Sequence, residues 1–194
     1  YHFLGENPIY ILIALVVLFV VAQVVSFIHR RVPSVKGGGI PSSIGILRGV
    51  IGLKWLATLI GTFLSSLITF FIGVPLGNEG PSVQMGTAIG KGAVPKVSKK
   101  YRAWQRYSMT GGACSGFSVA TGAPISGILF AIEEAHQRIS PMIFMVATVS
   151  VSASYITTEL IAPILGVSPT LFPSLSLRTL TALDLWIPLV VGAV

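Results

Sequence analysis

The residues best suited to chemistry lie in one stretch, VPLGNEGPSVQMGTAIG, which runs from Val74 to Gly90. Its single carboxylate, Glu79, lies between two glycines, and Pro81 fits the first position of a short uncharged helix over residues 82–89. The unpaired N–H groups and positive dipole end of that helix would surround Glu79, as in an anion site. Because the carboxylate can fill this site and leave it on protonation, the sequence predicts a proton-sensitive gate. The simpler alternative is a loop carboxylate in water.

A second acidic pair, Glu133 and Glu134, closes an apolar segment. Negative charge at the C-terminal end of a helix opposes the helix dipole, so the pair needs an explanation. One interpretation is a solvated helix end in which Arg138, four residues after Glu134, is the ion-pair partner and His136 assists. The other interpretation makes one of the two glutamates a proton acceptor at the cytoplasmic mouth of a transport path.

Other chemistries find less support in the residue patterns. Adjacent glutamates point to different helix faces and no H-E-x-x-H pattern exists, so we expect no metal site and no intramembrane metalloenzyme. Gly37–Gly39 could suggest a phosphate loop, but no G-x-x-x-x-G-K-[ST] motif follows. The single cysteine, Cys114, leaves no disulfide within the chain and no cysteine-based metal site. We interpret Glu159, late in an apolar span, as an interfacial residue rather than a second buried acid.

The composition indicates an all-α integral membrane protein. Of the 194 residues, 53% are hydrophobic and 10% are charged, whereas about a quarter are charged in soluble domains. The mean hydropathy is +0.84. The net charge of +7 does not indicate nucleic-acid binding, because the basic residues cluster between apolar spans. The apolar run at residues 186–194 stops abruptly, so we expect a fragment of a larger protein.

The apolar runs predict several membrane segments separated by basic loops. Ile9–Ile28 is long enough for one crossing, and the basic cluster His29–Arg31 after it marks the cytoplasmic side. Residues 37–41 predict a loop that opens into a short helix to about Val50. A second long span runs over Trp55–Leu76, and residues 91–106 hold six Lys/Arg and no acid. We interpret 91–106 as a cytoplasmic loop, with a specific lipid site as the alternative.

The second part of the chain predicts broken helices. The segment from Tyr107 to Ile132 is uncharged and rich in small residues, which let membrane helices pack closely. Pro124 divides it into helices near Tyr107–Val119 and Pro124–Ala135, and Ile139–Ile161 is a further span. Short segments interrupted by Pro and Gly are typical of transporters with discontinuous helices.

Three motifs resemble those of the CLC family of chloride channels and proton-coupled anion antiporters. Gly37-Gly38-Gly39-Ile40-Pro41 resembles the family's G-S-G-I-P, and Gly77-Asn78-Glu79-Gly80-Pro81 resembles its G-[KR]-E-G-P. The third motif resembles the family's stretch that ends in the internal glutamate pair. It consists of Gly122-Ala123-Pro124 and, after two residues, Gly127-Ile128-Leu129-Phe130-Ala131-Ile132-Glu133-Glu134. Their order and spacing also agree with the family.

This resemblance implies a CLC-type bundle of tilted and broken helices. Residues 1–194 would form the N-terminal part of the transmembrane pore domain, the first of two inverted halves, with the second half missing. The resemblance further implies a multi-pass protein of the cell (plasma or inner) membrane, embedded in the lipid bilayer. It would form a homodimer with a separate anion path in each subunit.

The resemblance also assigns roles to particular residues. Glu79 would be the gating glutamate, Glu134 the internal proton glutamate, and Glu133 would orient Glu134. The anion-binding positions would be Gly37, Gly38, Gly39, Ile40, Pro41, Asn78 and Gly80. No cofactor or metal is expected, since a halide ion and a proton are the substrates.

Two departures from the family pattern concern the choice of anion. Gly38 replaces a serine and so removes a hydroxyl donor, while Asn78 replaces a basic residue beside the gate. Both changes resemble the fluoride-exporting branch more than ordinary chloride members.

We therefore expect a proton-coupled antiporter of chloride or fluoride. The alternatives are a passive chloride channel, an intramembrane enzyme that uses the acidic cluster, and a structural or assembly subunit.

Overall fold

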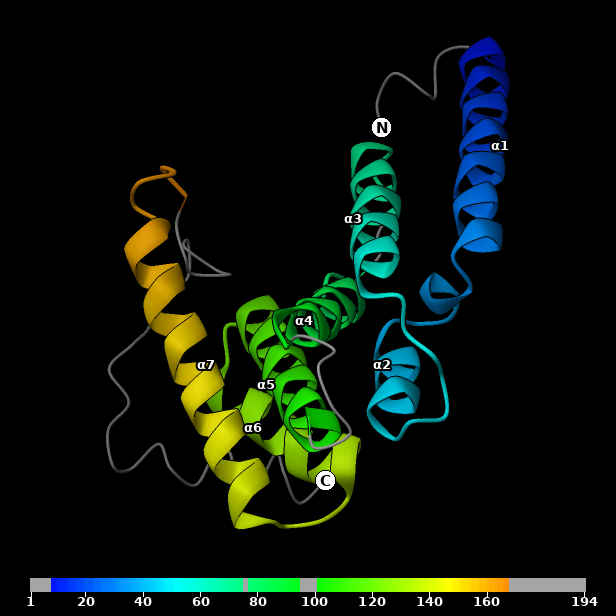
Figure 1. The fold of residues 1–194 in the computed structure, drawn as a ribbon. Helices are drawn as coiled ribbons and strands as arrows, with labels where there is room; N and C mark the ends of the chain where they lie inside the picture. Colours follow the sequence, from blue (N-terminus) through cyan, green and yellow to red (C-terminus); the bar gives the residue numbers. More distant parts are fainter. Residues whose placement is uncertain (1–7, 75–76, 95–100, 168–194) are drawn as a thin grey trace, which may run out of the picture.

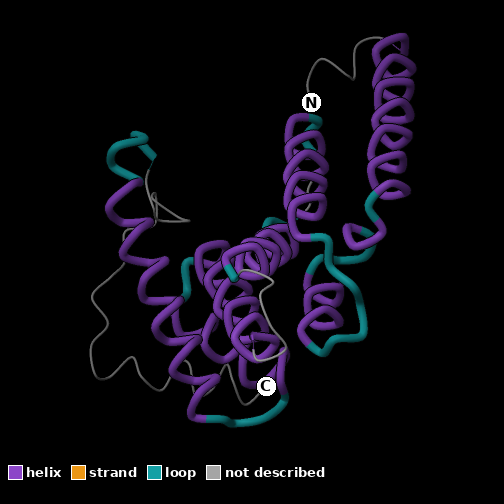
Figure 2. Tube along the Cα trace, viewed as in Figure 1, coloured by secondary structure: helices purple, strands orange, loops and turns teal. Residues whose placement is uncertain are grey.

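The computed structural model of the protein describes residues 8–74, 77–94 and 101–167, and every regular element in these ranges is a helix (Figures 1 and 2). The expected all-α class is therefore confirmed for this part of the chain. The elements are α1 (Pro8–Arg31), a 3-10 turn (Pro33–Val35), α2 (Ile40–Leu47), α3 (Trp55–Phe71), α4 (Glu79–Ala93), α5 (Tyr101–Thr121), α6 (Pro124–Phe130), a π-helical turn (Ala131–His136) and α7 (Pro141–Ile161).

Helices α1 and α3 lie side by side, and α3 also packs against α4 (Figure 1). Most apolar side chains of α1 from Ile11 onward are exposed, as hydrocarbon-facing residues are. Within the described ranges, α1 over Ile11–Arg31 and α7 have the length and apolar composition of a membrane crossing. α3, with 17 residues, is apolar but shorter. The span predicted to reach Leu76 ends at Phe71, and residues 75–76 lie outside the described part.

Helices α4 and α5 pack at backbone distance because glycines meet at their crossing. A Cβ atom on Gly112 would lie 2.1 Å from the carbonyl oxygen of Gly86, and one on Gly86 would lie 2.0 Å from that of Gly112. Farther along the same contact, a Cβ on Gly116 would lie 2.2 Å from the Ser82 carbonyl oxygen. The predicted role of small residues in close helix packing is confirmed here. Val83, Ala88 and Ala113 fill the adjacent core.

The break at Pro124 is confirmed, because α5 ends at Thr121 and α6 begins at Pro124. The second helix does not continue as a regular α-helix to Ala135. It widens into the π-helical turn Ala131–His136, which holds both glutamates, and Gln137 ends this turn in the left-handed conformation. No local signal in the sequence indicates this widening, and π-helical turns are frequent at functional sites.

The start and length of α4 correct two predictions. The helix begins at Glu79 and not at Pro81, since the Ser82 N–H already donates to the Asn78 carbonyl at 3.1 Å. Pro81 costs no hydrogen bond there, because the first-turn N–H groups of a helix have no partner within it. The helix also runs past residue 89 to Ala93 and carries Lys91, whose Nζ donates to the Leu53 carbonyl at 2.7 Å.

The remaining predicted segments fall largely outside the described residues. Of the basic stretch predicted as a loop, residues 91–93 belong to α4 and residues 101–106 to α5, while residues 95–100 lie outside the described part. The final apolar run at residues 186–194 also lies outside it.

The glycine crossing gives a direct test of the fold. We expect Gly112→Ala to force α4 and α5 apart and to destabilise the protein by about 1–3 kcal/mol, as overpacking does. Thermal unfolding of the purified full-length protein in detergent measures the effect. Gly52→Ala is the matched control, because a Cβ there meets nothing within 4 Å. Equal melting temperatures for the two variants would contradict the packing described.

Candidate functional site

The Gly37–Gly39 loop is a tight turn that depends on glycine. Gly39 has φ 71° and ψ −61°, and the Ile40 N–H donates to the Gly38 carbonyl at 2.7 Å, which defines a γ-turn centred on Gly39. This conformation is rare for residues with a Cβ. The turn leads directly into α2, where Pro41 occupies the first turn and Ser43 Oγ donates to the Gly39 carbonyl at 2.8 Å.

The same loop touches the first turn of α4. A Cβ on Gly39 would lie 2.4 Å from the carbonyl carbon and oxygen of Gly80, and one on Gly80 would lie 2.7 Å from the Gly38 carbonyl oxygen. The N-terminal ends of α2 and α4, forty residues apart in sequence, therefore meet with no side chain between them. The structure thus brings together the two motifs that the sequence predicted to bind an anion.

Two helix dipoles direct their positive ends toward this meeting point. Neither helix has a side-chain cap at its N-terminus. The first-turn N–H groups and the dipole ends of both helices favour a negative ligand. Gly39 and Ile40 are among the predicted anion-binding positions, but their N–H groups already donate to the Gly37 and Gly38 carbonyls, respectively. An anion that uses them must open the γ-turn.

A buried polar network holds the loop in place. Gln84 of α4 is 2% exposed; its Nε2 donates to the Ser34 carbonyl, and its Oε1 accepts from Thr62 Oγ1 of α3 at 3.1 Å. Ser34 Oγ lies 2.6 Å from Thr58 Oγ1, also in α3. The network ties the 3-10 turn before the glycines to both helices. Sequence reasoning missed Gln84, because one amide in a short helix does not reveal partners fifty residues away.

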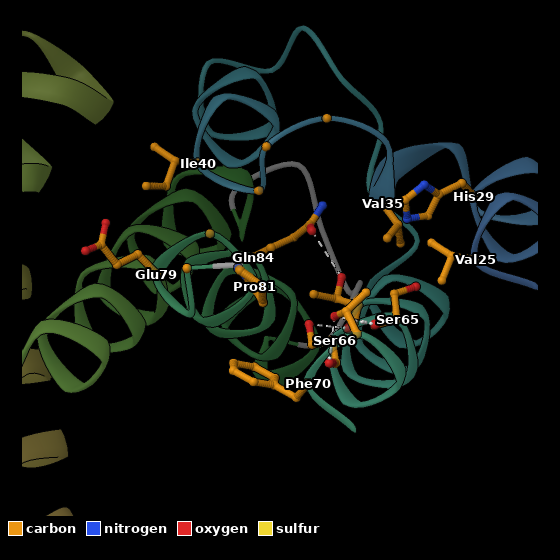
Figure 3. Close-up of a pocket in the computed structure, with 17 residues that line it drawn as sticks. Val25, His29, Val35, Ile40, Ser65, Ser66, Phe70, Glu79, Pro81 and Gln84 are labelled. Carbon is orange, nitrogen blue, oxygen red and sulfur yellow. Dashed lines mark hydrogen bonds between the residues drawn. The ribbon is translucent and has the colours of Figure 1, made fainter. Parts of the chain in front are cut away.

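A cavity of about 440 Å³ adjoins this meeting point (Figure 3). Its lining residues come from α1, the glycine loop, α3 and the first turns of α4, and they include His29, Ser65, Thr62, Glu79 and Gln84. Ser65 is 8% exposed, and its Oγ has no hydrogen-bond partner among the residues that the structure describes. A buried hydroxyl without a partner is costly, so Ser65 is available to a ligand in the cavity.

The predicted gate residue Glu79 lines this cavity, and Asn78 beside it does not. The Glu79 side chain is exposed, and Figure 3 shows it pointing away from the side of the cavity that His29, Val35 and Ser65 form. Asn78 is also exposed, and its Nδ2 donates to the Ala120 carbonyl at 3.4 Å, which links α4 to the end of α5.

Glu133 and Glu134 lie away from the cavity, on the π-helical turn, and both are exposed. The anticipated Glu134–Arg138 ion pair is not formed between these described side chains. Arg48 takes the role of the cation instead, because its Nη2 donates to the Glu134 carbonyl at 3.2 Å and its Nε to the Ala135 carbonyl at 3.5 Å. An arginine that donates to the last carbonyls of a helix is favourable there. No local sequence signal could pair Arg48 with Glu134, because the two residues are 86 positions apart.

Comparison with known proteins agrees with this arrangement. Residues 16–194 match the family model described as voltage gated chloride channel. The chain belongs to this family. Family membership makes it an integral membrane protein, which explains the exposed apolar surface of α1.

Its relatives in the voltage gated chloride channel family include proteins named H(+)/Cl(-) exchange transporter ClcA. The protein of Vibrio cholerae serotype O1 is 32% identical over 126 residues, which are 65% of this chain and 27% of the relative. The protein of Klebsiella pneumoniae is 35% identical over 123 residues, 63% of this chain and 26% of the relative. The matched segment therefore spans about a quarter of each relative's length.

The γ-turn generates a prediction for anion binding. We expect Gly39→Ala to weaken halide binding strongly, because a Cβ at positive φ costs about 1–2 kcal/mol and this one would also collide with Gly80. Gly38→Ala is the matched control, since its Cβ would make only ordinary contact with Pro41 at 3.6 Å. Calorimetric titration of the purified full-length protein with halide compares the two. If both variants bind halide as the unmodified protein does, the turn does not shape the site.

Proposed function

We propose that this chain forms part of a proton-coupled halide antiporter of the cell or inner membrane. The names of the ClcA relatives support exchange of chloride for protons. One observation carries the proposal: the N-termini of α2 and α4, neither of which has a side-chain cap, meet beside a cavity that Glu79 lines. A halide and a carboxylate compete for one positive site, so their occupancies are linked.

The mechanism follows from this competition. When charged, the Glu79 carboxylate is itself an anion and fills the site at the first turns of α2 and α4, which blocks the halide. When protonated, it loses its attraction to the dipole ends and leaves, so that a halide enters. Glu79 lines the cavity, so its carboxylate reaches and leaves the site by rotation of its side chain. A halide that binds the Ile40 N–H also requires the γ-turn to open. Each passage of halide is then coupled to a protonation event.

The proton needs a second acceptor on the cytoplasmic side. We assign this role to Glu134, with Glu133 orienting it, on the basis of the motif and their exposed position on the π-helical turn. Arg48 fixes this turn through the carbonyls of Glu134 and Ala135. A homodimer with one path in each subunit completes the proposed assembly.

The main alternative is a passive chloride channel, in which halide moves without protons. An enzyme or an assembly subunit would move neither. Proton uptake by liposomes that contain the full-length protein, measured while a halide gradient is applied, distinguishes these cases.

We predict that Glu79→Gln retains halide flux and abolishes halide-driven proton movement, because glutamine imitates the protonated gate and cannot release a proton. Paired chloride and pH recordings from the same liposomes measure both fluxes. Glu159→Gln, an equivalent change at the exposed Glu159 on α7, is the control and should leave coupling intact. Proton pumping that survives Glu79→Gln would refute the gate.

Selectivity depends on residue 38. Gly38 is exposed, and a Cβ there meets nothing closer than 3.6 Å, so a serine fits without moving the loop. We predict that Gly38→Ser raises the chloride-to-fluoride transport ratio about tenfold, since a hydrogen bond to an anion is worth roughly 1.5–3 kcal/mol and fluoride holds its water more tightly. Gly38→Ala separates the hydroxyl from added bulk. Efflux assays with each halide decide, and an unchanged ratio would show that Gly38 does not set selectivity.

A further inference from the structure

A second cavity, of about 740 Å³, lies at the opposite end of α2 from the glycine loop. It shares no lining residue with the cavity beside Glu79. Its lining comes from the C-terminal end of α2, the first half of α5, the end of the π-helical turn and the start of α7: Arg48, Ala103, Arg106, Tyr107, His136, Gln137, Arg138, Ser140 and Ile143.

The charge of this cavity is one-sided. Three arginines, Arg48, Arg106 and Arg138, line it together with His136, and no acid is among the lining residues. All three arginines are exposed at its wall, so a ligand reaches them from solvent. Like charges gathered at one cavity repel one another, and an anion that binds there removes this repulsion.

Backbone contacts fix two of the guanidinium groups. Arg48 donates to the carbonyls of Glu134 and Ala135, and Arg106 Nη2 donates to the Arg48 carbonyl at 3.3 Å. Each guanidinium has five N–H donors, so these contacts leave donors on both side chains. Arg138 makes no hydrogen bond or ion pair with any residue in the described ranges. Its charge is therefore available to a ligand.

His136 lines the same cavity as the three arginines. Its Nε2 lies 2.8 Å from Thr110 Oγ1. Burial lowers the pKa of His136 below its usual range, and the charges of Arg106 and then Arg48 lower it further. The ring is thus close enough to both guanidinium groups to feel their field.

The position of the cavity points to the membrane surface. It adjoins the start of α7, whose 21 residues form a candidate crossing, so it lies at one end of that crossing. Arg106 also ends the basic stretch over residues 91–106, which the sequence predicts to be cytoplasmic. A cavity at this level meets both lipid headgroups and soluble anions.

We propose that this cavity binds a phosphate group, either that of an anionic lipid headgroup or free inorganic phosphate. Planar guanidinium groups match the oxygens of phosphate in a forked geometry, which a spherical halide does not use. The hydroxyls of Tyr107 and Ser140 in the lining supply further donors. The proposal does not depend on antiport, because no residue of the cavity belongs to the assigned halide site.

The test compares Arg138→Gln with Arg102→Gln in the full-length protein. Both remove one exposed charge near the same face, but only Arg138 lines the cavity. Two probes are used: inorganic phosphate, titrated against the thermal stability of the protein in detergent, and phosphatidylglycerol in vesicles, with phosphatidylcholine vesicles as the uncharged reference. We expect Arg138→Gln to weaken binding about tenfold, as the loss of one charge-assisted hydrogen bond does, and Arg102→Gln to leave it unchanged.

The outcomes separate the two sources. Arg138-dependent binding of phosphatidylglycerol alone identifies a lipid headgroup, binding of inorganic phosphate alone identifies a soluble ligand, and binding of both supports the shared site. Saturable binding of neither probe, or equal weakening by the two substitutions, would overturn the proposal. Size-exclusion profiles and halide flux of both variants confirm that the protein remains folded.

Discussion

The contact between the Gly37–Gly39 loop and Gly80 sets how closely two helix N-termini approach, and the site depends on it. Dipole ends act over a few ångströms, so even one interposed methyl group would weaken their combined field. The Gln84 network maintains the contact, because it joins the turn before the loop to α3 and α4 through buried hydrogen bonds. The proposed halide site needs no buried cation, because helix dipoles and backbone N–H groups supply its positive charge.

Both ends of α2 serve electrostatic purposes. Its N-terminus adjoins the cavity that Glu79 lines. At its C-terminal end the Arg48 carbonyl accepts a hydrogen bond from Arg106, and positive charge is favourable there. Arg48 in turn supports the carbonyls around Glu134. An eight-residue helix thereby connects the region of the gate with the region of the internal glutamate. This connection is a structural route between the two positions to which we assign proton coupling.

Much of this arrangement was predictable from the sequence. Apolar runs predicted the helices and Pro124 predicted the break between α5 and α6. The two glycine motifs meet in the structure, and their role in anion binding stays a prediction. Local signals could not provide what depends on distant contacts: the hydrogen bonds of Gln84 to Ser34, or the pairing of Arg48 with the π-helical turn. The start of α4 was misplaced because proline is tolerated throughout the first turn, not only at its first position. The roles of Glu79, Glu133 and Glu134 in transport stay predictions.

The glycine-to-glycine contacts also restrict how this sequence can evolve. A Cβ on Gly39 would lie 2.4 Å from the Gly80 carbonyl, and one on Gly80 would lie 2.7 Å from the carbonyl oxygen of Gly38 in the same loop. At Gly86 with Gly112, either partner that acquires a side chain meets the other's carbonyl oxygen within 2.1 Å. No second substitution at the partner relieves such a clash, because glycine is already the smallest residue. Divergence at these four positions therefore requires the helices themselves to move. Position 38 carries no such restriction, because a Cβ there meets nothing closer than 3.6 Å. A lineage can therefore change this position, to which we assign the choice of anion, while the framework stays the same.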